Sequence, residues 1–513
     1  MATPSLAMIP SAYADSKVYS VLPNNGDGDF TFNRDSSATR VGQNGLIQTV
    51  GFFGSELVTN GDFATDSNWI KETGWTISGG KASYNGSASN NAIYQTISVT
   101  SGKIYKLSFT VVNYVSGTLI GNISTGATAG GTGNITANGD YSFNITASGA
   151  LCIFRSTSSF NGSIDNVSVQ EVTGDQPRLN YDISNGVVQS CPSLLLEPAS
   201  TNLITYSEDL NQIFTSNSTS GDGSFTVTPN YGISPSGTNT ATRIQLSASS
   251  GSYADVAHLT SSLNGTYTYS VYIKSLSGTP TMYLIYNGSS SIIQTISEDW
   301  VRYTFTFTHS GSVIPRFLIE PSGGTSASAD ILVWGAQLEA LSYATSYIPT
   351  NGSSQTRAAE TCNGAGTAST FNSTEGVLYA EISALADGTN QRWISIGSGS
   401  NANRVSILFN ATNKISCSVR GSSTAIYDAN FNIGSQTNNT KAAIRYKNSD
   451  FAFFVNGVKV DSQQSGSLSF NASLSELAFD SADGGSDFYG NTKDLRVYNE
   501  ALTDAQLQTL TTL

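Results

Sequence analysis

The chain has 513 residues, a formal net charge of −13 and a charged fraction of 12%, well below the about 25% of ordinary soluble domains. The negative charge argues against binding to a nucleic-acid phosphate backbone, and no apolar run approaches the roughly 18 residues that a membrane-spanning helix needs. The 24 Tyr, 23 Phe and 5 Trp argue against disorder. The length predicts about three or four domains.

The N-terminal segment bears on whether the chain is secreted, and the cysteines bear on the redox compartment in which it is made. Ala12-Tyr13-Ala14 has the small residues of a signal-peptide cleavage site, but no basic and no continuous apolar segment precedes it. We therefore expect the N-terminus to be retained. Four cysteines, at positions 152, 191, 362 and 417, show no CxxC spacing. We interpret them as small buried residues of a protein made in a reducing cytoplasm, without zinc or disulfides.

Two segments that read as halves of one unit lie far apart, at Phe30–Val50 and Gln176–Leu210. Each contains an Asn-Gly pair, at Asn44-Gly45 and Asn185-Gly186, which favours a hairpin with a type I′ turn. We expect the strands near Phe30–Val50 to pack with Pro177–Leu196. A domain can be inserted into another unit only where its own ends lie close together. The intervening residues are therefore predicted to form a compact inserted domain.

Three further regions alternate apolar and polar residues over many short segments, with Gly, Asn and Ser at the turns. Strands at about 8- to 12-residue spacing predict sandwiches or jelly rolls, so the predicted fold class is all-β and multidomain. In the last region, Asn456-Gly457 predicts a hairpin, and Thr503-Asp504 predicts the start of a short helix. The predicted boundaries are an N-terminal arm and hairpin (1–53), an inserted domain (54–174), the second half of the split unit (175–204), a second sandwich (205–345), a linker (346–361) and a last sandwich (362–513).

Residues suited to catalysis are scarce. Only His258 and His309 offer a base near neutral pH, and no GxSxG, HExxH or phosphate-binding glycine loop is present. Paired carboxylates can hydrolyse glycosides without histidine. The acidic residues of the last region do not have a diagnostic spacing: Glu375, Glu381, Asp480, Asp483 and Asp487. We predict no catalytic residues and no enzymatic activity.

Aromatic side chains offer a way to bind sugars, because their faces stack on the C–H surfaces of pyranose rings. Six residues are candidates for a glycan site: Trp69, Trp75, Tyr84 and Tyr94 in the inserted domain, and Trp393 and Tyr427 in the last region. The alternative for each is a place in its own hydrophobic core. We expect that alternative for Trp300 and Trp334, which adjoin alternating strands.

The split segment carries a resemblance to a known family. Phe32–Arg40, Pro177–Tyr181, Leu194–Pro198 and Thr201–Leu203 resemble a module that recurs in virion structural proteins of bacteriophages. The segment Tyr343–Thr361 resembles a segment that follows the second domain in these bacteriophage proteins. In those relatives the module usually runs without a long interruption, so the insertion is a departure.

The sandwiches carry resemblances of their own. The inserted domain resembles a jelly-roll carbohydrate-binding module through its opening Leu57–Phe63 and its closing Ser163–Val169, and the second sandwich is similar to the same class. That resemblance implies a structural calcium held by Asp62 and Asp165, because carboxylate oxygens suit this cation. The alternative is two turn aspartates that cap strand ends. The last region resembles a concanavalin A-like, laminin-G-like sandwich in its hairpin at Phe451–Val460 and its closing strand and helix.

Together these resemblances imply a non-enzymatic phage virion protein, such as a tail fibre, head fibre, capsid decoration or baseplate component, assembled in the host bacterial cytoplasm. The expected partners are other virion proteins, further copies of the chain as in fibre trimers, and host-surface polysaccharide. Nucleic acid, membrane insertion and any cofactor beyond the calcium are not expected. Two alternatives stay open: a secreted or cell-surface bacterial lectin-like adhesin, and a capsule polysaccharide depolymerase.

Overall fold

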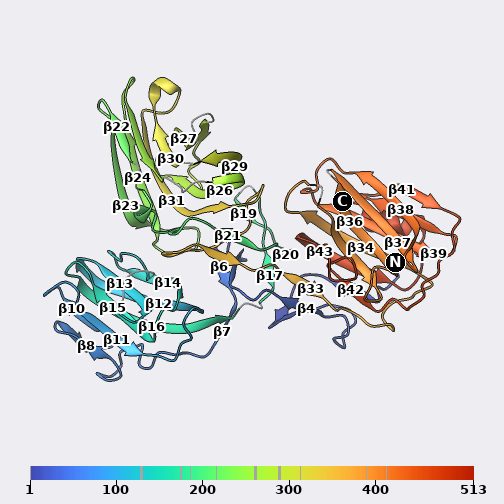
Figure 1. Ribbon diagram of the computed structural model, residues 1–513, viewed down its shortest axis with the longest axis horizontal. Coiled ribbons are helices and arrows are strands. Elements are labelled where there is room, and N and C mark those ends of the chain that lie inside the picture. Colours follow the sequence, from blue (N-terminus) through green and yellow to red (C-terminus); the bar gives the residue numbers. More distant parts are fainter. Residues whose placement is uncertain are drawn as a thin grey trace. The chain divides into compact units, whose positions relative to one another are not determined.

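The computed structural model describes residues 2–126, 131–173, 176–184, 186–214, 217–258, 263–286, 291–311, 314–388, 390–411 and 413–513. Almost all regular structure in these residues is β-strand (Figure 1), as the alternating sequence predicts. The chain forms two compact units, a first unit of Met1–Phe52, Gly174–Ala199 and Ala358–Leu513 and a second unit of Phe53–Thr173 and Ser200–Arg357. The chain therefore passes between the units four times, after Phe52, Thr173, Ala199 and Arg357.

The inserted residues of the second unit fold as a sandwich of two antiparallel sheets. Its strands are β8 (Ile70–Lys71), β9 (Trp75–Ile77), β10 (Ala82–Asn85), β11 (Ala92–Thr96), β12 (Ile104–Ser116), β13 (Leu119–Ser124), β14 (Gly139–Thr146), β15 (Leu151–Ser156) and β16 (Asn161–Thr173). One sheet has the order β14-β12-β16-β10-β9 and the other β13-β15-β11-β8. Alternate residues of β12, from Tyr105 to Val111, are buried, which gives each sheet one face in the core.

The remainder of the second unit forms a similar sandwich. Its elements are β21 (Ser200–Asn202), the 3₁₀ turn η1 (Leu210–Gln212), β22 (Ser218–Ser220), β23 (Ser224–Gly232), β24 (Ala241–Ser247), β25 (Tyr253–Ala257), β26 (Leu263–Ser275), β27 (Thr281–Tyr286), β28 (Ser291–Thr295), β29 (Val301–Gly311), β30 (Ile314–Ile319), η2 (Pro321–Gly323), β31 (Ser328–Glu339) and β32 (Gln355–Arg357). The sheet orders are β22-β25-β30-β27-β28 and β23-β24-β31-β26-β29. Trp334 is buried in this sandwich, as predicted, and Trp300 is half-buried.

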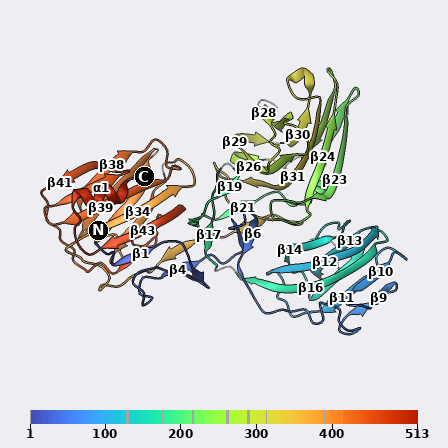
Figure 2. The same ribbon diagram turned by 180° about the vertical axis from the view of Figure 1, so that it is seen from behind.

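The C-terminal part of the first unit is a third sandwich. Its elements are β33 (Thr361–Asn363), β34 (Glu375–Ala384), β35 (Arg392–Gly397), β36 (Arg404–Ala411), β37 (Lys414–Gly421), β38 (Thr424–Asn432), β39 (Thr440–Lys447), β40 (Phe451–Val455), β41 (Val458–Gln463), β42 (Glu476–Ala478), β43 (Gly490–Tyr498) and α1 (Asp504–Thr511). One sheet has the order β38-β37-β36-β35-β42. In the other, β43, β34, β39, β40 and β41 are consecutive neighbours. Helix α1 packs on the outside of this second sheet (Figure 2), through Leu507 and Leu510.

The split segment supplies the remaining strands. Together with those of the N-terminal arm, they are β1 (Leu6–Met8), β2 (Tyr13–Ala14), β3 (Lys17–Val18), β4 (Phe30–Asn33), β5 (Ala38–Val41), β6 (Ile47–Val50), β17 (Arg178–Asn180), β18 (Ile183–Ser184), β19 (Val187–Val188) and β20 (Ser193–Leu196). Strand β7 (Phe52–Phe53) pairs with β16. Leu6–Met8 pair with one half of β43 and Leu194–Leu196 pair with the other half. Strands β1, β17 and β20 thus extend the sheet of the C-terminal sandwich and cover an edge that would otherwise be open, whereas β2, β3 and β4 form a separate sheet with β33.

The expected packing of the two halves on each other is confirmed. Tyr181 N donates to Val41 O at 3.1 Å, and Val41 N donates to Asn180 Oδ1 at 2.9 Å. Both halves also contain hairpins, β5–β6 and β18–β19. Residue Asn185, in the second predicted turn, lies outside the described residues.

The predicted turns differ in type. At Asn456-Gly457 both residues have positive φ, 49° and 78°, and Val455 pairs with Val458, which is the two-residue hairpin that the sequence predicts. At Asn44-Gly45 the hairpin is present, but β5 and β6 are joined by a five-residue loop, Gly42–Leu46, because Val41 pairs with Ile47. Only Gly45 has positive φ there, 76°, so the expected type I′ turn was wrong. Helix α1 begins at the predicted place with Thr503 as its N-cap, and a capping box between Thr503 and Gln506 completes this end.

A buried ion network joins the three stretches of chain that make up the first unit. Arg34 Nη1 donates to Glu360 Oε1 at 2.7 Å, and Arg178 Nε donates to the same oxygen at 2.8 Å. Arg178 also pairs with the second oxygen of Glu360 and donates Nη1 to Glu197 Oε2 at 2.6 Å. The exposed fractions of these side chains are 0 to 3%.

The network also holds the backbone around it. Arg178 Nη1 donates to Thr39 O at 3.2 Å, and Glu197 N donates to Glu360 Oε2 at 2.8 Å. Burial alone would lower the pKa of Arg178, but attraction to Glu360 and Glu197 raises it above its ordinary value. Arg34, Arg178, Glu197 and Glu360 lie in the segments Phe32–Arg40, Pro177–Tyr181, Leu194–Pro198 and Tyr343–Thr361, respectively. Their part in this chain is thus to hold one buried contact between distant segments.

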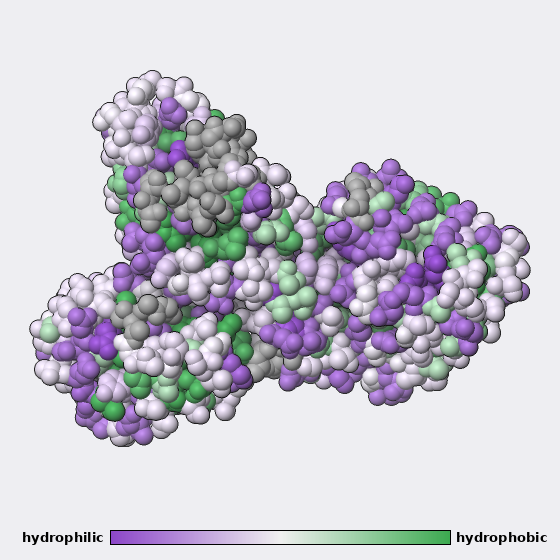
Figure 3. Space-filling model, viewed as in Figure 1, coloured by the Kyte–Doolittle hydropathy of each residue, from purple (hydrophilic) through white to green (hydrophobic). Residues whose placement is uncertain are grey.

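The surface and the cysteines complete the fold. The face seen in Figure 3 is mostly pale or purple with scattered green patches, as expected from a surface of small polar residues. Cys152, Cys362 and Cys417 are buried free thiols as predicted, but Cys191 is exposed, so its predicted burial was wrong. None of the described helices has the length and apolarity needed to cross a membrane.

Candidate ligand-binding pocket

The aromatic candidates of the inserted domain lie in its core. Trp69 packs against Phe63, with ring centroids 5.1 Å apart, and Trp75 packs against Tyr84 at 5.1 Å. All four of these side chains are buried. The assignment of Trp69, Trp75 and Tyr84 to a sugar platform is therefore corrected, since a ring inside a core cannot stack on a glycan. Tyr94, on β11, is half-buried.

The two candidates of the C-terminal sandwich are also buried. The Trp393 ring is covered by the Arg404 guanidinium, 4.1 Å from the ring centroid, and Tyr427 stacks on Phe451 at 5.5 Å. Trp393 and Tyr427 are respectively 6% and 2% exposed. This assignment is corrected for the same reason.

The two calcium candidates lie on segments that are joined by a backbone hydrogen bond. Asp62 lies in a turn before β8 and Asp165 lies within β16, and Val167 N donates to Gly61 O at 2.9 Å. Asp62 accepts from Ala64 N, the contact of an aspartate in a turn, and Asp165 accepts from the neighbouring Asn166 N. Among the described residues, no group of three or more His, Cys, Asp or Glu side chains is arranged to hold a metal ion. The calcium stays a prediction.

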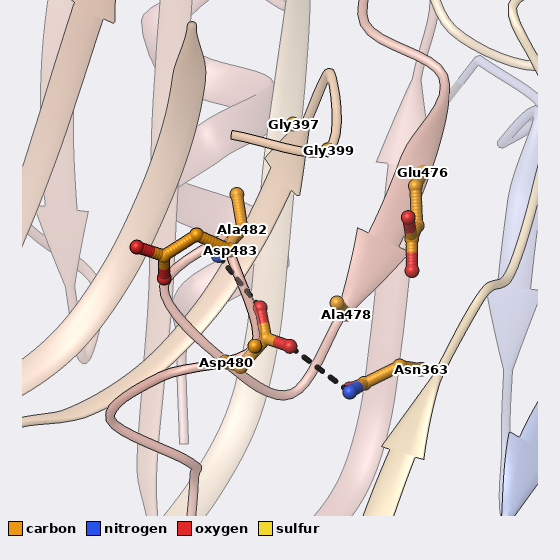
Figure 4. Close-up of a pocket in the computed structure, with 9 residues that line it drawn as sticks. Asn363, Gly397, Gly399, Glu476, Ala478, Asp480, Ala482 and Asp483 are labelled. Carbon is orange, nitrogen blue, oxygen red and sulfur yellow. Dashed lines mark hydrogen bonds between the residues drawn. The ribbon is translucent and has the colours of Figure 1, made fainter. Parts of the chain in front are cut away.

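The C-terminal sandwich contains a polar pocket of about 220 Å³. Figure 4 shows its residues coming from four places in the sandwich: β33 contributes Asn363, the end of β35 contributes Gly397, β42 contributes Glu476, and the following loop contributes Asp480 and Asp483. Gly399, Ala478, Ala482 and Gly484 complete the lining. The pocket is thus bordered by carboxylates on a floor of small residues.

Asp480 occupies the middle of the pocket and is held on both sides (Figure 4). Asn363 Nδ2 donates to Asp480 Oδ2 at 2.9 Å, and Ala482 N donates to Asp480 Oδ1 at 2.6 Å. Asn363 is itself oriented, because its Oδ1 accepts from Phe479 N at 2.9 Å. The Asp480 side chain therefore has one preferred position.

Burial raises the pKa of Asp480 to about 6, and repulsion from Asp487, Glu476 and Asp483 acts in the same direction. The Ala482 N–H opposes this shift by stabilising the charged form. Burial also raises the pKa of Asp487. Glu476, in contrast, makes no recorded hydrogen bond or ion pair within the described part of the chain, so its carboxylate is available to a ligand.

Small residues determine the shape of the pocket. A Cβ at position 397 would lie 2.4 Å from Ala482 Cβ, so only glycine allows the loop to approach β35 this closely. Ala482 has a φ of 72°, an uncommon value for a residue with a side chain. The loop is closed by Ser481, whose Oγ donates to Gly485 O at 2.8 Å.

Arg404 supports the loop from behind. Its Nη1 donates to Ser481 O at 2.9 Å, and the same atom contacts Asn401, which contacts Asp483. Burial, with repulsion from Arg420, lowers the pKa of Arg404. Sequence reasoning named Asp480 and Asp483 without assigning them a site, and missed Asn363, Gly397 and Glu476. The Asp-, Gly- and Ser-rich run at 480–487 was the signal that could have found the loop.

Residues 368–508 match the family model described as "Concanavalin A-like lectin/glucanases superfamily". The match includes all of the pocket lining except Asn363. It confirms the expected class of the C-terminal sandwich, and it spans about a quarter of the chain. A search of curated protein sequences finds no relative.

Solved structures show similar sandwiches. The chain is similar to the CBM40 domain of the Ruminococcus gnavus IT-sialidase bound to α2,3-sialyllactose (14% identity, 27% of this chain and 83% of that one, TM-score 0.24). It is also similar to the CBM22-1–CBM22-2 tandem of Paenibacillus barcinonensis Xyn10C (9%, 57% and 98%, TM-score 0.19) and to domains LG4-5 of the mouse laminin α1 chain (10%, 47% and 86%, TM-score 0.20).

Proposed function

We propose that this chain is a non-enzymatic structural protein of a bacteriophage particle whose C-terminal sandwich binds a neutral glycan in the acidic pocket. The observation that carries the binding site is the unpaired carboxylate of Glu476 beside the oriented Asp480, in a sandwich that matches a lectin-like family model. Carboxylates accept strong hydrogen bonds from sugar hydroxyls. Glu476, Asp480 and Asp483 would repel an acidic sugar.

The size of the pocket supports a short ligand. Its volume of about 220 Å³ is below the roughly 300 to 1,000 Å³ of sites that hold drug-sized molecules. The floor of Gly397, Gly399 and Ala482 leaves room for a ring to approach the carboxylates. A single terminal sugar of a host-surface polysaccharide fits these properties better than a long chain segment.

Glycan binding is tested by calorimetric titration of the full chain with neutral oligosaccharides first selected on an array. Glu476→Gln removes the charge and should weaken binding at least tenfold, because a charge-assisted hydrogen bond contributes about 1.5 to 3 kcal/mol. Glu375→Gln is the matched control, since Glu375 pairs with Lys447 at 2.8 Å in the same sandwich. Equal affinity of both variants and the unaltered chain would exclude this pocket as the site.

The same preparation tests the alternative of a depolymerase. The pocket contains three carboxylates, and Asp480 has a pKa raised to about 6; paired carboxylates of which one has a raised pKa also occur in glycosidases. Incubation with capsular polysaccharide should release no reducing ends. If the unaltered chain released reducing ends and Asp480→Asn did not, the pocket would be a hydrolytic site and the proposed binding function would be wrong.

The role in a particle is supported by the buried ion network. Arg34, Arg178, Glu197 and Glu360 come from four separate virion-like motifs and meet at one place, so the motifs act together as they would in a common module. Antibody labelling or electron microscopy of intact particles should locate the chain among other virion proteins, and sedimentation should show its copy number. A processed N-terminus on a cell-surface form would favour the adhesin instead.

A further inference from the structure

A second pocket lies where the two halves of the split segment meet, outside the residues that match the family model. Its volume is about 530 Å³, within the range of small-molecule sites. The lining residues are Ser11 and Tyr13 of the N-terminal arm, Arg40, Gln43, Asn44 and Gln48 of the first half, and Leu179 and Tyr181 of the second half. Neither half could form the pocket alone.

Arg40 is the only charged residue among those lining this pocket, and it has no acidic partner in the described part of the chain. Its guanidinium carbon lies 5.5 Å from the centroid of the Tyr13 ring, a cation–π distance. Its Nε is buried and makes no hydrogen bond within the described residues. Arg34 and Arg178, in the same segment, are paired with carboxylates. Because Arg40 has no carboxylate partner within the described residues, no ion pair has to be broken before its guanidinium binds an acceptor in the pocket.

The aromatic wall of the pocket is held in place by both halves. Tyr13 Oη accepts from Gln176 Nε2 at 2.8 Å, and Gln176 Oε1 accepts from Gly51 N at 3.0 Å. Tyr181 is positioned by its backbone bond to Val41. The Tyr13 ring and the guanidinium beside it are therefore arranged before any ligand arrives.

Amide side chains supply the neutral polar groups. Gln48 lies opposite Arg40 on the paired strand, and its Nε2 donates to Asn44 Oδ1 at 3.3 Å. Asn44 Oδ1 also accepts from Leu46 N. The Gln43 side chain makes no recorded hydrogen bond within the described residues. Amides both donate to and accept from sugar hydroxyls, so this set can bind a polyhydroxylated ring.

We propose that this pocket binds the carboxylate of a uronic acid residue in an acidic polysaccharide. The Arg40 fork matches a carboxylate in two parallel hydrogen bonds, the amides face the ring hydroxyls, and a tyrosine covers the C–H face. An acidic peptide has the same carboxylate, but it would leave the amides and tyrosines without hydroxyls and C–H faces to contact. The site is independent of the neutral-glycan pocket and has the opposite charge preference.

Calorimetric titration of the full chain with a homogeneous oligogalacturonate tests the proposal. Arg40→Met keeps the aliphatic stem and should lower the affinity at least tenfold, and Arg40→Lys should recover only part of it because the fork is lost. Arg496→Met is the matched control. Arg496 lies 5.9 Å from the Tyr379 ring centroid but pairs with Asp494 through two hydrogen bonds, so its removal should change the affinity less than twofold.

Further titrations distinguish an acidic polysaccharide from a neutral one and from an acidic peptide. The carboxyl-reduced oligosaccharide should bind at least tenfold more weakly than the oligogalacturonate, and Gln43→Ala, at an exposed loop position, should weaken binding several-fold without affecting folding. Glu476→Gln should leave this affinity unchanged. The proposal is overturned if oligogalacturonate does not bind at millimolar concentration, if Arg40→Met binds as the unaltered chain does, or if polyglutamate alone binds in an Arg40-dependent manner.

Discussion

The two pockets of the first unit are lined by side chains of opposite charge. In the acidic pocket, Asp480 is held by donors from Asn363 and Ala482, and burial raises its pKa to about 6. In the pocket of the split segment, Arg40 has no acidic partner among the described residues. The first pocket belongs to one sandwich, whereas the second requires two segments that are far apart in the chain. Because the chain has few charged residues, the position of those residues determines which ligands each pocket can bind.

The ion network provides a third arrangement that sharpens this difference. Its arginines are as buried as any residue in the chain, yet each contacts at least one carboxylate. Comparing Arg178 with Arg40 therefore separates an arginine that holds the fold from an arginine that is free to meet a ligand. The substitutions below test that separation, beginning with the one that should have the largest effect.

Glu360→Ala should cost most, because it leaves Arg34 and Arg178 buried with too few acceptors. Removing one partner from a buried ion pair costs about 3 to 5 kcal/mol, and both pockets should be lost with the first unit. The measurement is the denaturant transition of that unit, followed by limited proteolysis. Glu375→Ala, which breaks the half-exposed pair with Lys447, should cost less than about 1 kcal/mol. Similar costs for both variants would mean that the network does not stabilise the unit.

Gly397→Val should break the acidic pocket alone. The new side chain would meet Ala482, whose Cβ lies 2.4 Å from the position of the added Cβ, and overpacking costs about 1 to 3 kcal/mol. Neutral-glycan binding should disappear while oligogalacturonate binding through Arg40 remains. Gly388→Ala is a control, because its added Cβ would meet only Arg392 Nη2, at 3.5 Å. Loss of both activities would show that the pockets are not separable.

Asp480 should make the first unit less stable as the pH rises. Its pKa is 3.8 when unperturbed and about 6 in the fold, so the folded state binds the extra proton between these values. The stabilisation is present below about pH 4 and is lost as the pH passes about 6. After allowance for solvent screening, we expect about 1 to 2 kcal/mol.

The check is the difference in unfolding free energy between the unaltered chain and Asp480→Asn over pH 4 to 7. Asp487 and Asp494, whose pKa values are raised by burial, are present in both proteins and largely cancel in the difference. A difference that does not change with pH would show that Asp480 titrates in its ordinary range.

Arg40→Met should have the smallest effect on stability, within about 0.5 kcal/mol in either direction. The loss of the contact with Tyr13, about 0.5 to 1 kcal/mol, is offset by removal of a buried N–H without a partner. Arg178→Met should cost several kcal/mol by the same unfolding measurement. If the two substitutions lowered the free energy of unfolding equally, Arg40 would stabilise the fold as Arg178 does, and the proposed difference between the two arginines would be wrong.

The sequence predicted the local structure well where the turn and strand chemistry is self-contained. Asn456-Gly457 forms the expected two-residue hairpin, and Thr503 caps the expected helix. The contact between the halves of the split segment was also predictable, because both halves have unpaired alternating strands and a hairpin signal. For Asn44-Gly45, the register of the flanking strands lengthened the loop and changed the turn type.

The sites were less predictable than the fold. An aromatic residue on an alternating strand can face the core or the solvent, and the sequence does not say which until the second sheet is in place. Trp69 and Trp393 face the core for this reason. The residues that line the pockets are small, amide or acidic, and they carry no signal until distant segments bring them together.

By itself, the sequence determined an all-β chain of several sandwiches, a lectin-like C-terminal domain and the pairing of two distant segments, because periodicity and turn residues act over short range. Only the tertiary structure decided that the second segment extends the C-terminal sheet, that Arg34, Arg178, Glu197 and Glu360 meet in one buried network, and that Arg40 remains unpaired beside Tyr13. The physical reason is that charge pairing and burial depend on which strands become neighbours. For Arg34 and Glu360 those neighbours are separated by 326 residues in the chain.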